Sequence, residues 1–490
     1  MSLPLAFLPL LLTAGDIRVG SKGFTESVVL GEIASRTLAA SGIPAVHVRE
    51  LGGTRILWEA LERGQLDIYP EYTGTLAEEI FSGRVPATLE ALRPTLAARG
   101  VEIGAVLGFS NGYALGMREP AARRLGIRRF SDLLHHPELR FAFSNEFLDR
   151  GDGWRALQRA YGFPQTDVRG MDHDLAYRAL ESGGVDVTDL YSTDAEIQAL
   201  ALRVLEDDRR HFPDYRAVLL VRSQAARPAL LAALAPLDGR ISAPEMVAMN
   251  ARAKLDHVPE ARVAADFLQA AGLAVAPPRV PGLLDRLLKN LRDHLVLVAV
   301  SLAGAILVGL PLGILAARRP RLGQGVLGAV GVLQTLPSLA LLVLMIPLLG
   351  IGARPAIAAL FLYGLLPVVR NTHAGLTGIS AELRETAEAL GLSRWTRLAR
   401  VDLPLASPSI LAGVQTSAVI CVGTATLGAL VGAGGFGQPI LTGIRLADVG
   451  LLLQGAVPAA LLALAVQGAF ELVGRWMIPR GLRAGPPEAP

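Results

Sequence analysis

The chain has 490 residues, of which 51% are hydrophobic and 19% are charged, and its net charge is +3. This length leaves room for two or three domains, and the small net charge argues against a nucleic-acid partner. Cys421 is the only cysteine, and the eight histidines form no HxxxH pair. A disulfide within the chain and a cysteine-based metal site are therefore excluded, and we expect no metal and no cofactor.

The lysines exclude one class of enzyme. A phosphate-binding P-loop needs Gly-Lys followed by Ser or Thr. Lys22, Lys254 and Lys289 are followed instead by Gly, Leu and Asn. We therefore expect no ATPase site and no catalytic residues in this chain, so that any ATP hydrolysis comes from a separate protein.

The first residues are apolar and end in small side chains. Residues 1–15 lack the basic start that is usual in a secretion signal. Both a short signal peptide and an uncleaved apolar anchor fit this pattern. Either would deliver the chain from residue 16 onward to the outside of the membrane.

Residues 16–276 carry nearly all the acidic side chains and alternate short aliphatic runs with longer helical ones. Residues 17–20 and 45–51 predict strands, and residues 27–41 and 54–64 predict helices, with Thr54 as a helix N-cap. Alternation of this kind predicts an α/β protein with a parallel sheet, in two lobes.

Six short motifs follow one another in this half. They are residues 20–26 (GSKGFTE), 67–75 (DIYPEYTGT), 111–113 (NGY), 146–150 (EFLDR), 189–194 (DLYSTD) and 212–215 (FPDY). Together they resemble the binding proteins of glycine betaine/choline importers, a family of two-lobed, periplasmic-binding-protein-like domains. Gly23 and Ala195 stand where that family usually has asparagine and glycine, which bears on fine specificity more than on class.

The resemblance implies a site for a quaternary ammonium ligand. Such a group donates no hydrogen bond, but the faces of aromatic rings attract it by roughly 0.5–2 kcal/mol per ring. The positions that match the family's aromatic box are Tyr72, Tyr113, Tyr191 and Tyr215. Those that match its carboxylate-binding end are Lys22, Thr75 and Arg150. The alternatives are tyrosines that only pack in the core, and surface positions for Lys22 and Arg150. Tyr69 is expected to be structural.

Two further motif matches carry no function. Residues 108–112 (GFSNG) match the GxSxG nucleophile elbow but lead into Tyr113 without a clear helix. Residues 432–437 (GAGGFG) match GxGxxG, but Gln438 and Pro439 follow where a nucleotide-binding helix would begin. Close packing of membrane helices is the simpler explanation of these glycines.

The second half is predicted to be an all-α transmembrane domain, residues 295–480. Prolines in residues 276–282 predict a linker, and residues 283–294 predict an amphipathic segment on the membrane surface. Apolar runs that could cross a bilayer follow at residues 295–317, 325–349, 355–369, 407–431 and 450–477. The second run contains residues 334–340 (QTLPSLA), which resemble the second membrane helix of the permease family, and its Pro337 predicts a kink. Residues 481–490 are expected to be disordered.

The charges of the loops predict the orientation. An excess of arginine in a short loop marks the cytoplasmic side. Arg318, Arg319 and Arg321 follow the first run, and Arg475, Arg480 and Arg483 follow the last. Both loops are therefore placed inside, and the odd number of crossings places the N-terminal domain outside.

Residues 385–404 form a charged island between two apolar runs and carry three of the arginines. The positions that form a spaced pattern are Glu385, Thr386, Ala387, Gly391, Val401, Leu403 and Pro404. The pattern resembles the coupling loop of bacterial ABC importer permeases, a helix–Gly–helix that docks on the ATPase. Thr386 replaces an alanine of that pattern.

These observations predict a binding protein fused to its permease. The chain is expected in the cell (inner) membrane, surrounded by lipid, as a homodimer that imports a quaternary ammonium osmolyte with a separate ABC ATPase. A ligand-gated receptor or channel remains an alternative, as does a membrane-anchored hydrolase that uses Ser110.

Overall fold

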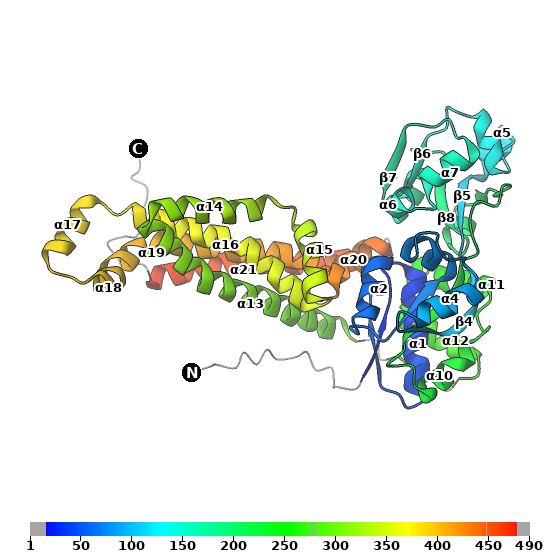
Figure 1. The fold of residues 1–490 in the computed structure, drawn as a ribbon, viewed down its shortest axis with the longest axis horizontal. Coiled ribbons are helices and arrows are strands. Elements are labelled where there is room, and N and C mark those ends of the chain that lie inside the picture. The colour runs from blue at the N-terminus through cyan, green and yellow to red at the C-terminus, as the bar shows by residue number, and fades with distance from the viewer. Residues whose placement is uncertain (1–15, 274, 279–280, 447, 478–490) are drawn as a thin grey trace. The chain divides into compact units, whose positions relative to one another are not determined.

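The computed structural model describes residues 16–273, 275–278, 281–446 and 448–477. The chain divides near residue 280 into two compact units (Figure 1). The predicted signal or anchor at residues 1–15 and the predicted tail at 481–490 lie outside the described residues.

The first unit consists of two lobes. The first lobe begins with β1 (Ile17–Gly20), α1 (Thr25–Ala40), β2 (Ala45–Val48), α2 (Thr54–Glu62), β3 (Ile68–Tyr72), α3 (Thr73–Thr75), η1 (Leu76–Ile80), α4 (Leu89–Ala97) and β4 (Val101–Ser110). After the second lobe the chain returns to it with β10 (Arg216–Arg222), α10 (Pro228–Leu234), η3 (Ala235–Leu237), α11 (Ala243–Lys254) and α12 (Glu260–Ala270).

The sheet of the first lobe has the order β2-β1-β3-β10-β4. β1 pairs in parallel with β2 and β3, but β10 is antiparallel to both β3 and β4. The expectation of a parallel sheet is therefore wrong at β10. The reason is the route of the chain, because β10 enters the sheet from the second lobe and so runs in the opposite direction.

The predicted elements agree with the observed ones except at their ends. β2 ends at Val48 rather than at residue 51, and Glu50 has a positive φ of 58°, which a continuing strand does not accept. The N-cap of α2 is Gly53 and not Thr54. The hydroxyl of Thr54 instead accepts a hydrogen bond from Lys22 Nζ at 2.9 Å.

The second lobe is inserted between β4 and β10. It contains β5 (Tyr113–Arg118), α5 (Glu119–Leu125), η2 (Phe130–His135), β6 (Phe141–Ser144), α6 (Asn145–Asp149), α7 (Trp154–Tyr161), β7 (Val168–Met171), α8 (His173–Glu181), β8 (Thr188–Tyr191), α9 (Glu196–Ala199) and β9 (Leu202–Val204). Its strands form the sheets β8-β5-β9 and β6-β7.

Two neighbouring chain crossings join the lobes. One leads from β4 to β5 and the other from β9 to β10. The backbone N–H of Asn111 in the first donates to the carbonyl of Tyr215 in the second at 3.0 Å. The two crossings therefore form a single junction between the lobes.

The second unit is all helical. It contains α13 (Leu283–Arg318), α14 (Pro320–Thr335), α15 (Ser338–Leu349), α16 (Ala353–Thr377), α17 (Ala381–Ala389), α18 (Arg394–Arg397), η4 (Leu398–Asp402), α19 (Leu403–Thr424), η5 (Ala425–Val431), α20 (Gly437–Arg445) and α21 (Val449–Met477). Among the described residues, four helical stretches are long and apolar enough to cross a membrane, and the pair α14 and α15 makes a fifth if it counts as one span.

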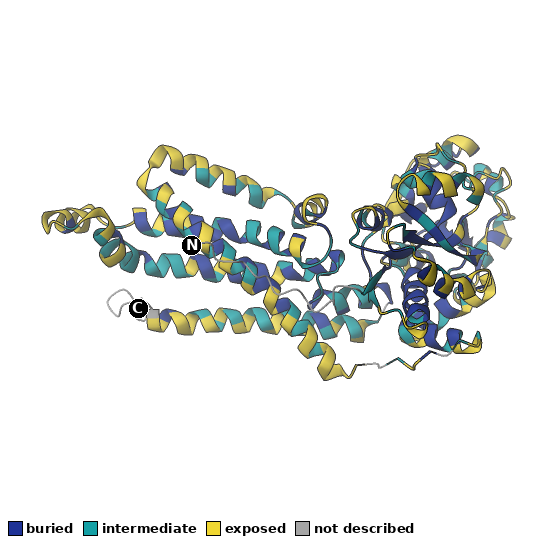
Figure 2. Cartoon of the chain, turned by 60° about the horizontal axis from the view of Figure 1, so that its bottom comes forward, coloured by how far each residue is buried: buried dark blue, intermediate teal, exposed yellow. Residues whose placement is uncertain are grey.

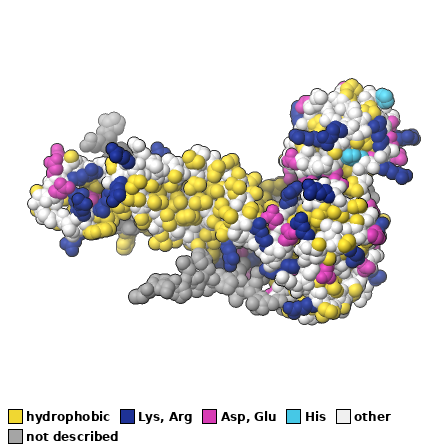
Figure 3. Space-filling model, viewed as in Figure 1, with side chains coloured by type: hydrophobic (Ala, Val, Ile, Leu, Met, Phe, Trp, Pro, Cys, Tyr) yellow, Lys and Arg dark blue, Asp and Glu magenta, His cyan; other side chains and the backbone are white. Residues whose placement is uncertain are grey.

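Glycines allow the membrane helices to pack closely. A Cβ on Gly313 of α13 would lie 2.5 Å from Thr372 Cβ of α16, and one on Gly413 of α19 would lie 2.6 Å from the Pro367 carbonyl of α16. Hydrophobic side chains cover the visible flank of this unit, and charged side chains gather at the end that carries α17 and α18 (Figure 3). The last helix remains largely exposed (Figure 2).

Two predictions about this unit need correction. The expected boundary at residue 294 is absent, because α13 runs without a break from Leu283 to Arg318. The expected kink at Pro337 is a break, since α14 and α15 are bent by 99°. The break removes the helical hydrogen bond of the Leu336 carbonyl. The Tyr363 hydroxyl donates a hydrogen bond to this carbonyl in its place.

Candidate functional site

The junction between the lobes gathers the four predicted box tyrosines. Tyr72 ends β3, Tyr113 begins β5, Tyr191 ends β8, and Tyr215 directly precedes β10. Tyr113 and Tyr191 are also direct partners in the antiparallel β5–β8 pair. The ends of strands from both lobes, and the tyrosines that they carry, therefore meet at the junction between the lobes.

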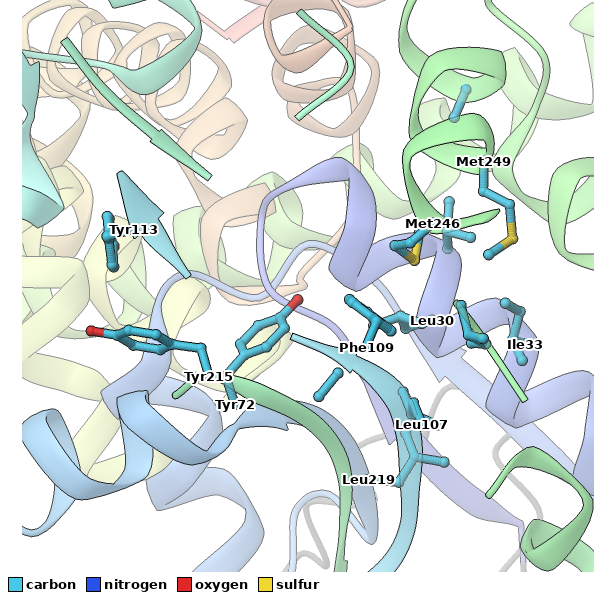
Figure 4. Close-up of a cluster of buried hydrophobic side chains, with 14 of the residues drawn as sticks. Leu30, Ile33, Tyr72, Leu107, Phe109, Tyr113, Tyr215, Leu219, Met246 and Met249 are labelled. Atoms are coloured by element: carbon cyan, nitrogen blue, oxygen red, sulfur yellow. The ribbon is translucent and has the colours of Figure 1, made fainter. Parts of the chain in front are cut away.

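Three of the four rings are in contact. The ring centroids of Tyr113 and Tyr191 are 4.9 Å apart, and their hydroxyl oxygens are 3.2 Å apart. Tyr215 meets Tyr113 edge-on at 5.9 Å. Figure 4 shows Tyr72, Tyr113 and Tyr215 in one buried cluster with Leu30 and Phe109. The rings are therefore both core side chains and neighbours of the junction.

Phe24 joins Tyr72 to this group. Its ring centroid lies 6.4 Å from that of Tyr72 and 6.0 Å from that of Tyr191. Phe147 and Phe212 pack on Tyr113 at 5.2 and 6.1 Å. None of the three phenylalanines was predicted as a site residue, although each lies inside one of the motifs that the sequence offers.

Arg150 reaches the same rings. The centre of its guanidinium lies 4.9 Å from the Tyr113 centroid and 5.9 Å from that of Tyr215. Nε and Nη2 each donate to Asp152 at 2.8 Å, and the Tyr215 hydroxyl donates to the same carboxylate. The side chain is 3% exposed, so the alternative of a surface position is wrong for Arg150.

Lys22 is also buried and paired. Its Nζ donates to Glu71 Oε1 at 2.6 Å and lies 5.6 Å from the centroid of Tyr72. Its side chain is 6% exposed, which excludes a surface position here too. Thr75 is buried at the end of α3, directly after the strand that carries Tyr72. The structure thus places all seven predicted residues near the junction, with both cations already held by carboxylates.

A cavity between the two lobes is lined by two of the seven predicted residues, Lys22 and Tyr191, and the other five do not line it. Among the side chains that line it are Lys22, Phe24 and Glu26 from the first lobe, and His173 and Tyr191 from the second. Lys254 of α11 also lines it and pairs with Asp174 of α8 and Glu196 of α9. The neighbouring carboxylates raise the pKa of Lys254, although burial alone would lower it, so it remains charged.

The His173 side chain packs against the ring of Tyr191. Its Nε2 lies 3.1 Å from Asp194 Oδ2, and its Nδ1 lies 3.5 Å from Asp189 Oδ2. Burial alone would lower the pKa of His173, but Asp189 and Asp194 outweigh it and raise the pKa well above its usual range. His173 is therefore an imidazolium that sequence reasoning missed, because its partners are distant in the chain.

Ser110 belongs to the junction. Its hydroxyl donates to Asp214 Oδ1 at 2.7 Å and accepts from the Tyr215 backbone N–H at 3.2 Å. These two bonds hold the crossings together. They give Ser110 a structural role, and nothing in this arrangement supports the hydrolase alternative.

The predicted coupling segment is a helix, a glycine and a helix. α17 carries Glu385 and Ala387, Gly391 has a φ of 68°, and α18 leads through η4 into α19, which begins at Leu403 and Pro404. Leu390 and Trp395 are 72% and 76% exposed. This charged end of the helical unit therefore presents apolar side chains to its surroundings.

Comparison with known proteins gives matches for both units. Residues 15–270 match the substrate binding domain of ABC-type glycine betaine transport systems. Residues 309–479 match the inner membrane component of binding-protein-dependent transport systems.

Individual relatives match each unit. The glycine betaine/carnitine/choline transport system permease protein OpuCB of Bacillus subtilis is 39% identical over 197 residues, which are 40% of this chain and 91% of that protein. The ergothioneine transport permease/ergothioneine binding protein EgtU of Helicobacter pylori is 34% identical over 265 residues, which are 52% of this chain and 47% of that protein. A crystal structure titled as a glycine betaine/carnitine/choline ABC transporter has a TM-score of 0.46 at 28% identity, and covers 53% of this chain and 99% of its own.

Proposed function

Because the chain belongs to the family of substrate binding domains of ABC-type glycine betaine transport systems, joined to a permease unit of the binding-protein-dependent class, we propose that it binds a quaternary ammonium solute and passes it through the membrane. The solutes named for its relatives are glycine betaine, carnitine, choline and ergothioneine, and all of them carry a trimethylated ammonium group. Membership of an ABC importer family also implies a separate ATPase.

The observation that carries this proposal is the meeting of Tyr72, Tyr113, Tyr191 and Tyr215 at the lobe junction. Rings at that place can turn their faces to a cation that enters between the lobes. Closure of the two lobes about the junction would complete the enclosure.

Lys22, Arg150 and Thr75 would hold the polar end of the ligand. Each cation is already paired, Lys22 with Glu71 and Arg150 with Asp152. An ammonium has three N–H groups and a guanidinium five, so donors remain for a ligand carboxylate. This arrangement favours ligands that are held mainly by their ammonium group. Their carboxylate or hydroxyl adds a weaker contact to Lys22, Arg150 or Thr75.

The helical unit would form half of the translocation path, and two copies of the chain would complete it. We place residues 16–276 outside and residues 385–404 inside, because arginines gather in the loops assigned to the inner side. The segment with Glu385, Ala387, Gly391, Leu403 and Pro404 would then transmit the force of the ATPase. Lipid surrounds the apolar flank of the helices.

Two measurements test the proposal on the full-length chain. Calorimetric titration with choline, glycine betaine, carnitine and ergothioneine should show saturable binding of at least one. Co-purification with an ABC ATPase, and hydrolysis that the same solute stimulates, should follow. If none of the solutes bound, the assignment of the ligand class would be wrong. If one bound but no ATPase joined the chain, a receptor would be the better description.

A further inference from the structure

Glu26 is the acidic side chain closest to the box tyrosines that has no assigned role. It lies in the first turn of α1, two residues after Phe24, and it lines the cavity together with Phe24 and Tyr191. The residue is only 3% exposed. A carboxylate in such a place needs a physical reason, because taking a charge out of water is costly.

Four neutral groups hold this carboxylate. Oε1 accepts from the Tyr72 hydroxyl at 2.6 Å and from Asn111 Nδ2 at 3.0 Å. Oε2 accepts from the Thr193 hydroxyl and from Asn250 Nδ2 at 3.1 Å. Two bonds to each oxygen are the full acceptor set of an ionised carboxylate. The donors come from the end of β3, the β4–β5 crossing, the turn after β8 and α11, so Glu26 is fixed in position relative to the rings.

The charge of Glu26 is not balanced within the protein. Three other charged side chains at the cavity have an opposite partner: Lys22 has Glu71, His173 has Asp194, and Lys254 has Asp174 and Glu196. Glu146 and Asp172 also line the cavity, but both are exposed to solvent. Among the residues that the structure describes, none of the ion pairs includes Glu26. Burial raises the pKa of Glu26, while the hydrogen bonds from Thr193, Tyr72 and Asn250 act in the opposite direction and favour the ionised carboxylate.

We propose that Glu26 is a specificity-determining residue, whose negative charge is completed by the permanent cation of the ligand. This inference rests on the proposed function. It states that the site selects ligands by their permanent positive charge, and not only by the apolar shape of a trimethylated head group. Ring faces attract a cation but also pack well against a neutral group of the same shape. A buried carboxylate distinguishes the two, because it gains only when the ligand is charged.

The test compares two ligands of one shape. Choline and 3,3-dimethylbutanol differ only in that a neutral carbon replaces the ammonium nitrogen. Both are titrated into the full-length chain by calorimetry. For Glu26→Gln we expect a loss of choline affinity of about tenfold to a hundredfold, because an attraction across a partly screened interior disappears. The affinity for 3,3-dimethylbutanol should change by less than about threefold, since its contacts carry no charge.

A second variant guards against a folding defect. Glutamine at position 26 has one acceptor where the carboxylate has two, so Glu26→Gln alone could disturb the junction. The double variant Glu26→Gln with Asn250→Asp reverses the direction of the hydrogen bond between positions 250 and 26 and returns a negative charge to the adjacent position. It gives up the second bond of Asn250, from Nδ2 to the Thr193 carbonyl, so its fold is checked by thermal unfolding before the titration. It should restore the preference for choline over 3,3-dimethylbutanol to within about tenfold of the unmodified chain.

Each outcome is decisive. An equal loss for both ligands in Glu26→Gln would show a purely structural role and overturn the inference, as would a folded double variant that fails to regain the preference. If the unmodified chain bound none of choline, glycine betaine, carnitine and ergothioneine, the proposed function itself would fail. Binding of choline with no effect of position 26 would overturn only the role given to Glu26.

Discussion

The imidazole of His173 packs against the ring of Tyr191, with their centroids 4.5 Å apart and their planes tilted by 41°. The Tyr191 ring at the cavity is therefore supported by a neighbouring side chain that also lines the cavity and that two aspartates hold in place. Since Tyr191 also touches Tyr113, His173 supports two rings of the box through one contact.

Because His173 can lose its proton, the free energy of unfolding of the binding unit should depend on pH. Because the folded pKa of His173 is raised above its ordinary value of 6.5, its stabilisation is fully present below pH 6.5 and is lost as the pH rises through the raised pKa. We expect the free energy of unfolding of the binding unit to fall over that alkaline range, and His173→Asn to remove this part of the slope. Chemical denaturation at several pH values measures it. The exposed His135→Asn is the control, and an identical slope in both variants would contradict the expectation.

Removal of one box ring should weaken binding without unfolding the chain. Tyr113→Ala or Tyr191→Ala is expected to lower the affinity for the quaternary ammonium ligand about tenfold to a hundredfold, since ring face and apolar contact are lost together. The matched Phe variants keep the ring and should stay within about threefold, because only a hydroxyl contact is lost. Calorimetric affinities that do not change in the alanine variants would remove these rings from the site.

The buried pair of Arg150 and Asp152 should show strong mutual dependence. Arg150→Met leaves Asp152 buried without its cation, and we expect a loss of about 3–5 kcal/mol in the free energy of unfolding of the binding unit. Arg150→Met combined with Asp152→Asn should lose clearly less, because no charge is left unpaired. Denaturation followed by tryptophan fluorescence provides the values for Arg150→Met, Asp152→Asn and the double variant. Strictly additive losses would show that the two side chains act independently.

Gly391 should matter for transmission and not for binding. Its φ of 68° is left-handed, and a β-branched residue there costs about 1–2 kcal/mol. In Gly391→Val we expect unchanged solute affinity, with solute-stimulated ATP hydrolysis and transport reduced by roughly an order of magnitude. Gly391→Asn, which tolerates this conformation better, should retain most of the activity. Normal transport in the valine variant would exclude a role of this turn in docking.

The sequence was sufficient to predict the fold class and to single out residues that meet at the lobe junction, where local motifs specify them. Tyr72 and Thr75 lie in one continuous motif, and the alternation of elements predicted the two-lobed α/β architecture. The prediction of a parallel strand was wrong for β10. Its direction depends on the path of the chain through the second lobe, which local motifs do not specify. The break between α14 and α15 exceeded the expected kink because neighbouring side chains, such as Tyr363, decide how far a proline-containing helix can open.

Ion pairs between distant residues were beyond the reach of sequence patterns. Lys22 pairs with Glu71 and His173 with Asp194. Glu26 collects donors from positions up to Asn250. Each of these residues is an ordinary charged side chain in the sequence, and only the folded chain brings its partners to it. Burial of Lys22 and Arg150 therefore had to be seen and could not be inferred.

The insertion of the second lobe into the first affects how the binding unit can be altered by exchange of a segment. It leaves the first lobe at Ser110 and rejoins it before Arg216, and its two ends meet where Asn111 bonds to Tyr215. A module with adjoining ends can be replaced as a whole by the equivalent piece of a related protein, with only two splice points and no rerouting of the host. The fold thus allows the half of the pocket that carries Tyr191 and His173 to be exchanged, while the membrane machinery keeps its own sequence.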